Sequence, residues 1–504
     1  MNRRMHRLAQ LDHAHLWHPF TQMRDWLDRE PIVIASGKGA VLRDVHGREY
    51  LDGNSSIWTN LHGHNQPHVN AAIRRQLRNI AHSSALGLAN EPASRLAAEL
   101  ARVANPKSIY PPGKSREQGK RKMNFPSSAP RPLNLSKVFF SDDGSTAMEV
   151  ALKLAYEFAR RTGRSKKPGF LSLADAYHGD TLGAVSLGHI GLFHKAYAGL
   201  LFKSDSVMSP YCYRCPFNRA KPERADAREY RQCNWECVGK VEQKFAARLR
   251  RGNPYAAMVI EPLIQGAAGM IPHPAGWLRR IAEIVRGHGA QLIADEVMTG
   301  FGRTGVPSGV THPPLRTLFA CHHEGVQPDF LALAKGLTGG YLPMAATLTT
   351  QTVFDAFLGD YDEFKTFFHG HSYTANPLGA AAALASLELL QSAASIRARR
   401  RLEQALDREI KTLWSLPNVG DIRQVGLIVG LELVRDWRRR EPFELRERAG
   451  ARVCEAMAKR GVLTRPIGSV IVLMPPYCTT PAQTGKMIRA LRDGIDEVFG
   501  KRRL

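Results

Sequence analysis

The chain has 504 residues, of which 43% are hydrophobic and 23% are charged, and its formal net charge is +24. This composition is that of a soluble globular protein, and the length suits one large domain with a smaller companion. No apolar run reaches the ~18 residues of a membrane span. The basic N-terminus has no apolar stretch behind it, which excludes a secretory signal, so we expect a cytoplasmic enzyme.

The positive charge is spread along the whole chain. Its densest groups are Lys114–Lys122, Arg397–Arg401 and Arg435–Arg440. Aromatic side chains are not interleaved with these groups, as a surface that stacks nucleic-acid bases requires. We therefore predict general surface charge and neither a nucleic-acid nor a membrane partner.

Five apolar, strand-like runs alternate with longer helical patterns, and polar residues follow each run directly. The runs are Val138–Phe140, Phe170–Leu173, Ala257–Ile260, Leu292–Ala294 and Phe330–Ala334. Strands that alternate with helices predict an α/β fold with a mainly parallel sheet. Ligands bind at the edge of such a sheet where its strands end, so the polar residues after the runs are candidate site residues.

Three segments interrupt this pattern and are interpreted as insertions at residues 108–135, 212–237 and 306–316. The first is rich in Pro, Lys, Arg and Ser, which is typical of an exposed loop. From about residue 384 onward, Arg- and Leu-rich helical patterns surround the short strand candidates Leu427–Val429 and Val470–Val472. This pattern predicts a second, smaller α+β domain at the C-terminus.

Four of the seven cysteines cluster in the second insertion. Cys212 and Cys215 have the C-x-x-C spacing, and Cys233 and Cys237 have three residues between them. The cluster resembles a four-thiolate zinc site, although the second spacing is looser than that of a usual zinc knuckle. A loop with unpaired thiols is the other interpretation, and both stay open. Disulfides are not expected in a cytoplasmic chain.

Lys335 and Asp295 each follow an apolar run, at two neighbouring strand ends. A lysine and an aspartate so placed suit an aldehyde cofactor attached to the lysine as an imine, with the carboxylate on its pyridine nitrogen. That cofactor is pyridoxal phosphate, and Lys335 would also move a proton once a substrate amine displaces it. Two ordinary polar residues at the edge of a sheet are the alternative.

A phosphate site and a ring contact are predicted from nearby segments. Gly144 and Ser145 form a small-residue turn that leads into a helix, where backbone N–H groups and the helix dipole favour a phosphate. A simply capped helix explains the same residues. Tyr177, at another strand end, can cover the ring with its aromatic face. Arg303 is a candidate for orienting the Asp295 carboxylate.

With these residues the chain resembles the class III, fold-type I pyridoxal-phosphate aminotransferases, over roughly residues 15–495 apart from the insertions. The matching stretches include Trp17–Met23, Gly53–Trp58, Ser141–Ser145, Tyr177–Thr181, Ile260–Gly266, Asp295–Gly305, Lys335–Gly340, Phe368–Tyr373 and Thr464–Pro466. Within the family, the first and last of them indicate the branch that aminates 8-amino-7-oxononanoate to 7,8-diaminononanoate in biotin synthesis.

The resemblance implies how the chain is divided. Residues 66–375 would form the large cofactor-binding domain, and residues 376–504 the small α+β domain. Residues 1–65 would contribute to the small domain and to the substrate pocket. Family sites form between two copies of the chain, so the resemblance also implies a homodimer with shared active sites.

The resemblance implies roles for single residues as well. Lys335 would carry the cofactor, Asp295 would pair with its pyridine nitrogen, and Tyr177 would stack on the ring. The phosphate would be held by Gly144 and Ser145 and, from the neighbouring subunit, by His371 and Ser372. Arg465 would bind the substrate carboxylate. The substrate pocket would be lined by Phe20, Ile57, Tyr177 and Gly370.

The amino donor is S-adenosylmethionine or lysine. Members of the family that use S-adenosylmethionine typically have a tyrosine, a tryptophan and a tyrosine where this chain has Phe20, Ile57 and Val472. The segments 366–373 and 463–466 are more similar to the branch that takes the amine from lysine, which favours lysine.

Two other functions stay open at this stage. Another class III transaminase, acting on a diamine or another ω-amino acid, would share the cofactor residues. A basic zinc- or nucleic-acid-binding protein on an inactive enzyme scaffold is the third, and the intact Lys335 and Asp295 argue against it.

Overall fold

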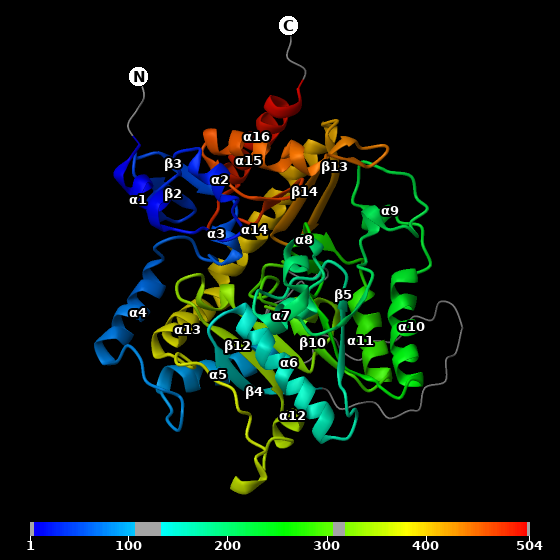
Figure 1. Cartoon of the computed structure of the whole chain (residues 1–504). Helices are drawn as coiled ribbons and strands as arrows, with labels where there is room; N and C mark the ends of the chain where they lie inside the picture. Colours follow the sequence, from blue (N-terminus) through cyan, green and yellow to red (C-terminus); the bar gives the residue numbers. More distant parts are fainter. Residues whose placement is uncertain (1–4, 106–132, 306–317, 501–504) are drawn as a thin grey trace.

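The computed structural model describes residues 5–105, 133–305 and 318–500. Figure 1 shows a central sheet layered with helices, below a smaller part in which the two ends of the chain meet. The predicted insertion at residues 306–316 lies outside the described residues, and so does the one at 108–135 except for its last three positions.

The central sheet has seven strands in the order β4-β12-β11-β10-β7-β5-β6. Their bounds are β4 (Leu135–Ser141), β5 (Gly169–Leu173), β6 (Asp205–Val207), β7 (Tyr255–Ile260), β10 (Gln291–Asp295), β11 (Phe330–Leu333) and β12 (Ala345–Thr350). β6, β5, β7, β10 and β11 run parallel, whereas β12 is antiparallel to both β11 and β4. The mainly parallel sheet and all five predicted strands are confirmed; β6 and β12 were not predicted.

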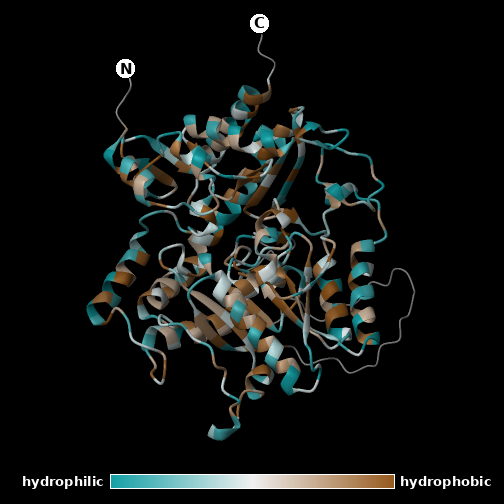
Figure 2. Cartoon of the chain, viewed as in Figure 1, coloured by the Kyte–Doolittle hydropathy of each residue, from teal (hydrophilic) through white to brown (hydrophobic). Residues whose placement is uncertain are grey.

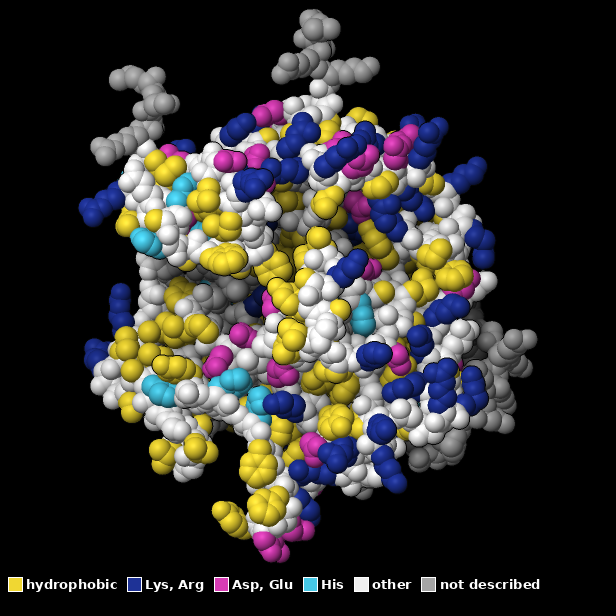
Figure 3. Space-filling view, in the orientation of Figure 1, with side chains coloured by type: hydrophobic (Ala, Val, Ile, Leu, Met, Phe, Trp, Pro, Cys, Tyr) yellow, Lys and Arg dark blue, Asp and Glu magenta, His cyan; other side chains and the backbone are white. Residues whose placement is uncertain are grey.

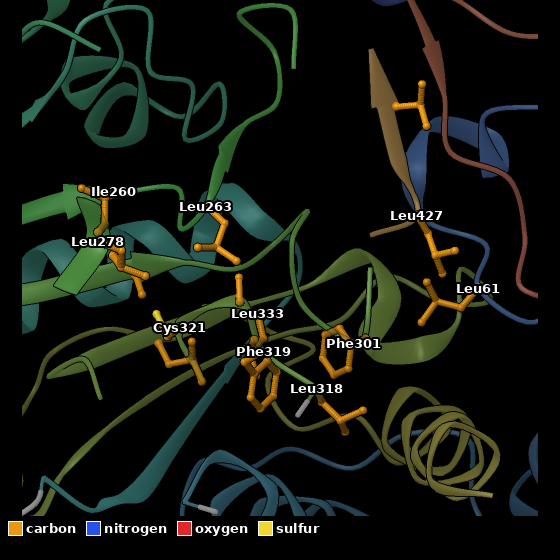
Figure 4. Packing of buried hydrophobic residues seen from close by; sticks show 14 of the residues in the cluster. Leu61, Ile260, Leu263, Leu278, Phe301, Leu318, Phe319, Cys321, Leu333 and Leu427 are labelled. Carbon is orange, nitrogen blue, oxygen red and sulfur yellow. The ribbon is translucent and has the colours of Figure 1, made fainter. Parts of the chain in front are cut away.

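Helices cover both faces of this sheet. On one face Val259 and Ile293 pack against α6, and on the other Met258 and Leu292 belong to the main core, because successive strand residues point to opposite faces. The helices between the two ends of the chain, not all of which contact the sheet, are α4 (Pro67–Asn79), α5 (Glu91–Ala104), α6 (Gly144–Arg161), α7 (Leu182–Leu187), α8 (Gly191–His194), α9 (Ala227–Tyr230), α10 (Glu236–Arg250), α11 (Trp277–Gly287), α12 (Gln351–Asp355) and α13 (Pro377–Gln391). The central strands β7, β10 and β11 are accordingly mostly apolar (Figure 2). In the core shown in Figure 4, the Phe301 and Phe319 rings meet edge to face at 5.6 Å.

The two ends of the chain share a sheet. The N-terminal strands β1 (Ile34–Lys38), β2 (Val41–Asp44) and β3 (Glu49–Asp52) are completed by the C-terminal β16 (Val462–Leu463), which pairs with β3. The other C-terminal sheet contains β13 (Val419–Val425), β14 (Ile428–Asp436), β15 (Glu441–Pro442), β17 (Pro466–Ile467) and β18 (Val470–Leu473). The helices of this part are α1 (Arg7–His15), α2 (Met23–Leu27), α3 (Ser55–Trp58), α14 (Ala393–Ile410), α15 (Ala449–Lys459) and α16 (Pro481–Phe499). Both predicted C-terminal strands are therefore confirmed as parts of β14 and β18.

No single helix in the described residues is long and apolar enough to cross a membrane. One consecutive pair, Pro377–Gln391 and Ala393–Ser415, passes the same test only when joined, and it is bent by 70° at the junction.

The cysteine-rich insertion binds the C-terminal sheet. Arg214 donates to Glu432 of β14 from Nε at 2.8 Å, and the buried Arg423 of β13 reaches the same carboxylate at 2.5 Å. Arg228 of α9 donates to the Gln424 carbonyl at 2.8 Å. The polar, basic composition of this segment therefore supplies ion pairs between two parts of the fold, because a buried charge needs a partner.

Cys212, Cys215, Cys233 and Cys237 line one small cavity. All four are free thiols, and the Arg231 guanidinium lies 3.0 Å from the sulfur of Cys233. In the described part of the chain, no three His, Cys, Asp or Glu side chains are placed to hold a metal ion. The zinc interpretation therefore finds no ligand set in this cluster.

Candidate active site

A cavity of about 730 Å³ opens where the parallel strands of the central sheet end. Five of the predicted site residues line it together: Gly144, Ser145, Tyr177, Asp295 and Lys335. They come from four separate segments, which follow β4, β5, β10 and β11. The expectation that strand-end residues converge at one edge is thus met, and the volume suits a small-molecule cofactor with part of a substrate.

Lys335 begins the turn after β11 in a left-handed conformation, with φ of 44°. Its Nζ lies 5.5 Å from the centre of the Trp58 ring and has no hydrogen bond or ion pair to any described residue. Burial lowers the pKa of this amine, although the carboxylates of Asp295 and Glu261 act in the opposite direction. A lysine with a lowered pKa and no partner is a better nucleophile than a solvated one, because more of it is neutral.

Asp295, the last residue of β10, is 5% exposed. It accepts a hydrogen bond from Nδ1 of the buried His178 at 2.8 Å and one from the Val297 backbone N–H at 3.0 Å. The hypothesis that Arg303 orients this carboxylate is wrong. The Arg303 guanidinium instead donates to the carbonyls of Pro475, at 2.9 Å, and Asn60, at 3.2 Å.

The N-terminus of α6 forms a cradle of backbone groups at the cavity. Asp143 caps the helix by accepting the Thr146 N–H at 2.9 Å, whereas the first N–H groups of a helix have no partner within it. The Ser145 hydroxyl accepts the backbone N–H of Asp180 at 2.7 Å, which ties the cradle to the loop after β5. A Cβ on Gly144 would lie 2.7 Å from a methyl of Val297, so only glycine fits there. Helix N–H groups and a hydroxyl so arranged suit an anion such as phosphate.

Tyr177 stands at the wall of the cavity, and its hydroxyl donates to Asp180 at 2.6 Å. Burial and this bond raise the pKa of the phenol well above its usual value, so it stays neutral. Its ring lies edge to face with Phe193 at 6.3 Å, and Phe193 contacts Phe20 at 5.3 Å. Phe20 is 59% exposed and does not itself line the cavity.

Ile57 and Trp58 lie in a turn in which residues 55–58 all have positive φ. This conformation is uncommon outside glycine, and runs of it are costly without support. The Trp58 indole N–H donates to Asn54 at 2.8 Å and the ring lines the cavity, whereas the Ile57 side chain does not. Trp58 was not among the predicted site residues, since its motif was used only to recognise the family.

Gly370, His371 and Ser372 lie on the segment after α12 and do not line the cavity of their own chain. His371 is 3.5 Å from Asp142, a residue of the cavity wall, and Ser372 is exposed. Arg465 is exposed between β16 and β17, without a hydrogen bond or ion pair to a described residue. The roles predicted for Gly370, His371, Ser372 and Arg465 involve a second chain or a substrate, so these roles stay predictions.

Two further residues of the site, His178 and Glu261, were missed as site residues. Glu261 directly follows the run Ala257–Ile260, and His178 follows Tyr177 in the loop after Phe170–Leu173, so a rule that counts every polar residue of these segments would have found them. Sequence spacing does not reveal that His178 contacts Asp295, since the two are 117 positions apart.

Three comparisons with known proteins agree with this geometry. The family described as aminotransferase class-III matches residues 23–495. The adenosylmethionine-8-amino-7-oxononanoate aminotransferase of Nitratidesulfovibrio vulgaris is 45% identical over 97% of this chain and 81% of its own length. That of Geobacter sulfurreducens is 44% identical over 98% of both chains. The crystal structure of the Methanocaldococcus jannaschii enzyme of the same name has a TM-score of 0.82 at 35% identity, covering 97% of this chain and 98% of that one.

Proposed function

Because the chain belongs to the class III aminotransferases, we propose that it aminates 8-amino-7-oxononanoate through pyridoxal 5'-phosphate, giving 7,8-diaminononanoate in biotin synthesis. The observation that carries the proposal is the Lys335 amine, which has no hydrogen bond or ion pair to the described residues and shares one cavity with the buried Asp295 and the helix cradle. The relatives' names supply the substrate.

The residues present fit this cofactor. The free N–H groups at the start of α6 suit its phosphate, and the Asp295 carboxylate suits a protonated pyridine nitrogen. A Cβ on Gly144 would collide with Val297, so glycine lets the start of α6 lie close to the segment that follows Asp295. When bound, pyridoxal phosphate supplies a ring that accepts electrons from the substrate carbon next to nitrogen.

Each of the site residues would then have a distinct task. The Lys335 Nζ would hold the cofactor and would move a proton to and from the substrate carbon. The Asp295 carboxylate would favour a positive charge on the pyridine nitrogen, and His178 holds Asp295 in position through its Nδ1–H. Tyr177 and Trp58 form the walls of the cavity and exclude water from the reacting atoms.

Arg465 is proposed to bind the carboxylate of the oxononanoate. Its guanidinium is exposed and has no carboxylate partner in the described residues, and its planar shape suits bidentate pairing with such a group. The Thr464 hydroxyl bonds the Val472 carbonyl, which fixes the backbone beside it. Ile467, two residues on, packs with Trp58 against the buried cluster that contains Met298, and both Trp58 and Met298 line the cavity.

The acceptor is tested with the pyridoxamine form of the purified enzyme. We expect 8-amino-7-oxononanoate to restore the visible band of the cofactor, and Arg465→Ala to raise the KM for it by about 10²-fold with kcat less affected, because a charge-assisted bidentate pair is lost. Stopped-flow absorbance measures both. Arg460→Ala, which removes a half-buried arginine that pairs with Glu497, is the control for loss of a nearby positive charge. Reoxidation by another ω-amino aldehyde or ketone but not by this substrate would support another class III transaminase instead.

Lysine is the proposed amino donor, with S-adenosylmethionine as the alternative. Phe20 packs on Phe193 without a hydroxyl, and Val472 is fully buried in the cluster with Met298. Neither position therefore offers the polar contact that a tyrosine would give an adenosyl group. We expect the visible absorbance of the pyridoxal form to decay at least about tenfold faster with L-lysine than with S-adenosylmethionine.

The donor preference can be followed in single turnovers with each donor alone. Phe20→Tyr adds one hydroxyl at an exposed position, so it is expected to improve the rate with S-adenosylmethionine without changing the rate with lysine. Faster discharge of the wild-type enzyme by S-adenosylmethionine would overturn the choice of lysine.

A homodimer is part of the proposal. Large exposed apolar side chains, namely Leu86, Leu88, Phe364, Phe368 and Tyr373, lie on the segments around residues 84–90 and 361–373. The His82 and Tyr373 rings, 4.9 Å apart, bring the two segments together, and hydrophobic side chains are seen on this lower edge in Figure 3. Patches of this kind mark protein interfaces. A partner that covers them would bring His371 and Ser372 close to another chain.

We expect Leu86→Arg with Phe368→Arg to halve the mass of the particle in solution, since two charges would be buried at the interface. Light scattering after gel filtration measures this mass. Leu445→Arg changes an equally exposed leucine elsewhere and is the control. A wild-type enzyme that is monomeric and active would overturn the dimer.

The proposed compartment is the cytoplasm. All seven cysteines are free, which is the usual state in a reducing compartment. Basic side chains are dispersed over the visible surface in Figure 3 and are not gathered in one patch, which gives no support to a nucleic-acid partner.

A further inference from the structure

Glu261 is a buried carboxyl group in the cavity wall for which the transamination steps above need no role. It follows directly on β7 and is 6% exposed. One of its oxygens accepts the backbone N–H of Gly266 at 2.8 Å, and the other accepts the backbone N–H of Tyr177 at 3.3 Å. The side chain therefore joins the loop after β5, which carries the ring-stacking residue, to the turn after β7.

The charged groups that face Glu261 come from three other elements. They are His178 in the loop after β5, Asp295 at the end of β10 and Lys335 after β11. His178 already gives its Nδ1–H to Asp295, and its Nε2 has no hydrogen-bond partner in the described residues. Burial raises the pKa of Glu261 to about 7, opposed by His178 and the two N–H groups. The group therefore carries a negative charge in the upper part of the ordinary pH range.

We propose that Glu261 is a positioning residue of the cofactor site, whose carboxylate fixes the backbone under Tyr177 and adds a second negative charge beside Lys335. The inference rests on the proposed function. Opposite charge favours the protonated form of a nitrogen nearby, so Glu261 and Asp295 together stabilise a proton on the nitrogen of Lys335, both before and after the cofactor is attached.

A second buried glutamate separates this role from ordinary structural support. Glu296 is fully buried, accepts the backbone N–H groups of Ala320 at 2.6 Å and Cys321 at 2.8 Å, and has its pKa raised by burial to about 7. It resembles Glu261 in each of these respects, but it does not line the cavity. The same substitution at the two positions therefore differs mainly in whether the lost charge faces the cavity that holds Lys335.

The test is a pH titration of the visible band of the holoenzyme. Glu261→Gln removes the charge and keeps the size of the side chain. Its amide NH2 group would face the Tyr177 N–H, so the hydrogen bond to Tyr177 is lost as well. We expect the titration midpoint to fall by about one pH unit, the order expected for one nearby charge in a protein interior. Cofactor release should become several-fold faster. Glu261→Asp, which keeps the charge, should restore most of the midpoint, and Glu296→Gln should lower the unfolding temperature without moving the midpoint.

Glu261→Met is a second neutral variant of similar size and must shift the midpoint in the same direction. The role of Glu261 would be overturned if a neutral variant folds and its midpoint equals that of the wild type. An equal shift of the midpoint in Glu296→Gln would overturn it as well. If neither neutral variant folds, a midpoint for Glu261→Asp far below the wild-type value would also overturn the charge argument. Failure of the proposed function looks different, because the pyridoxamine form of the wild-type enzyme would then not be reoxidised by 8-amino-7-oxononanoate, whereas the midpoints of the Glu261 variants would still shift as expected.

Discussion

Replacement of Lys335 by alanine is expected to abolish transamination, with kcat/KM lower by about 10⁴-fold or more, because one nitrogen both attaches the cofactor and moves the proton. The visible band is expected to lose its sensitivity to borohydride, since no protein amine is then bonded to the cofactor. Steady-state rates and mass spectrometry of the reduced protein measure the two effects.

The same substitution is not expected to destabilise the cofactor-free protein. Burial lowers the pKa of Lys335, so below its unfolded pKa the unfolded chain binds more protons at this position than the folded chain. Folded stability at this group therefore falls as the pH is lowered, and alanine removes this cost. An unfolding temperature at least equal to that of the wild type is the expected result. Lys240→Ala, an exposed change on α10, is the control, and substantial activity of Lys335→Ala would contradict the proposed function.

Replacement of Asp295 by asparagine is expected to lower kcat by about 10³-fold, the size of effect seen when one preorganised electrostatic group is lost from an active site. Asparagine can still accept the His178 N–H through its oxygen, so the geometry is kept while the charge opposite the pyridine nitrogen is lost. Pyridoxal phosphate should also bind more weakly, which a fluorescence titration measures.

Asp329→Asn is the matched control for this substitution. Asp329 accepts the backbone N–H of Leu292 at 2.8 Å and lies just before β11. It is therefore at the end of β10 and β11 that lies away from Asp295. We expect this variant to change stability but not kcat. Equal losses of kcat in the two variants would mean that the effect of Asp295→Asn arises from the sheet and not from the cofactor.

The sequence was sufficient to predict five strands of the central sheet and most of the strand-end residues that line the cavity. Runs such as Ala257–Ile260 are fully buried strands in a parallel sheet, and such strands are apolar at every position. A polar residue directly after such a run marks the end of the strand, and Lys335 and Asp295 could be selected as candidates in this way. The antiparallel β12, Ala345–Thr350, was missed because it mixes alanine and threonine and has no polar site residue after it.

The partner of a buried charge could not be predicted in the same way. Arg303 is close to Asp295 in sequence, and proximity suggested a contact, but a turn of the chain directs its guanidinium to the carbonyls of Asn60 and Pro475. His178 is far away in sequence, and it meets Asp295 because β5 and β10 both pair with β7. The register of the strands decided which side chains meet.

The sequence by itself determined five strands of the central sheet, the small-residue start of the helix at Gly144 and Ser145, and the positions of Lys335 and Asp295 at strand ends, since each depends on a few neighbouring residues. Only the tertiary structure decided how they are completed: His178 behind Asp295, Glu261 under Tyr177, and Trp58 in a strained turn beside Lys335. The physical reason is that hydrophobic periodicity is a local property, whereas the burial and pairing of a charge depend on every segment packed around it.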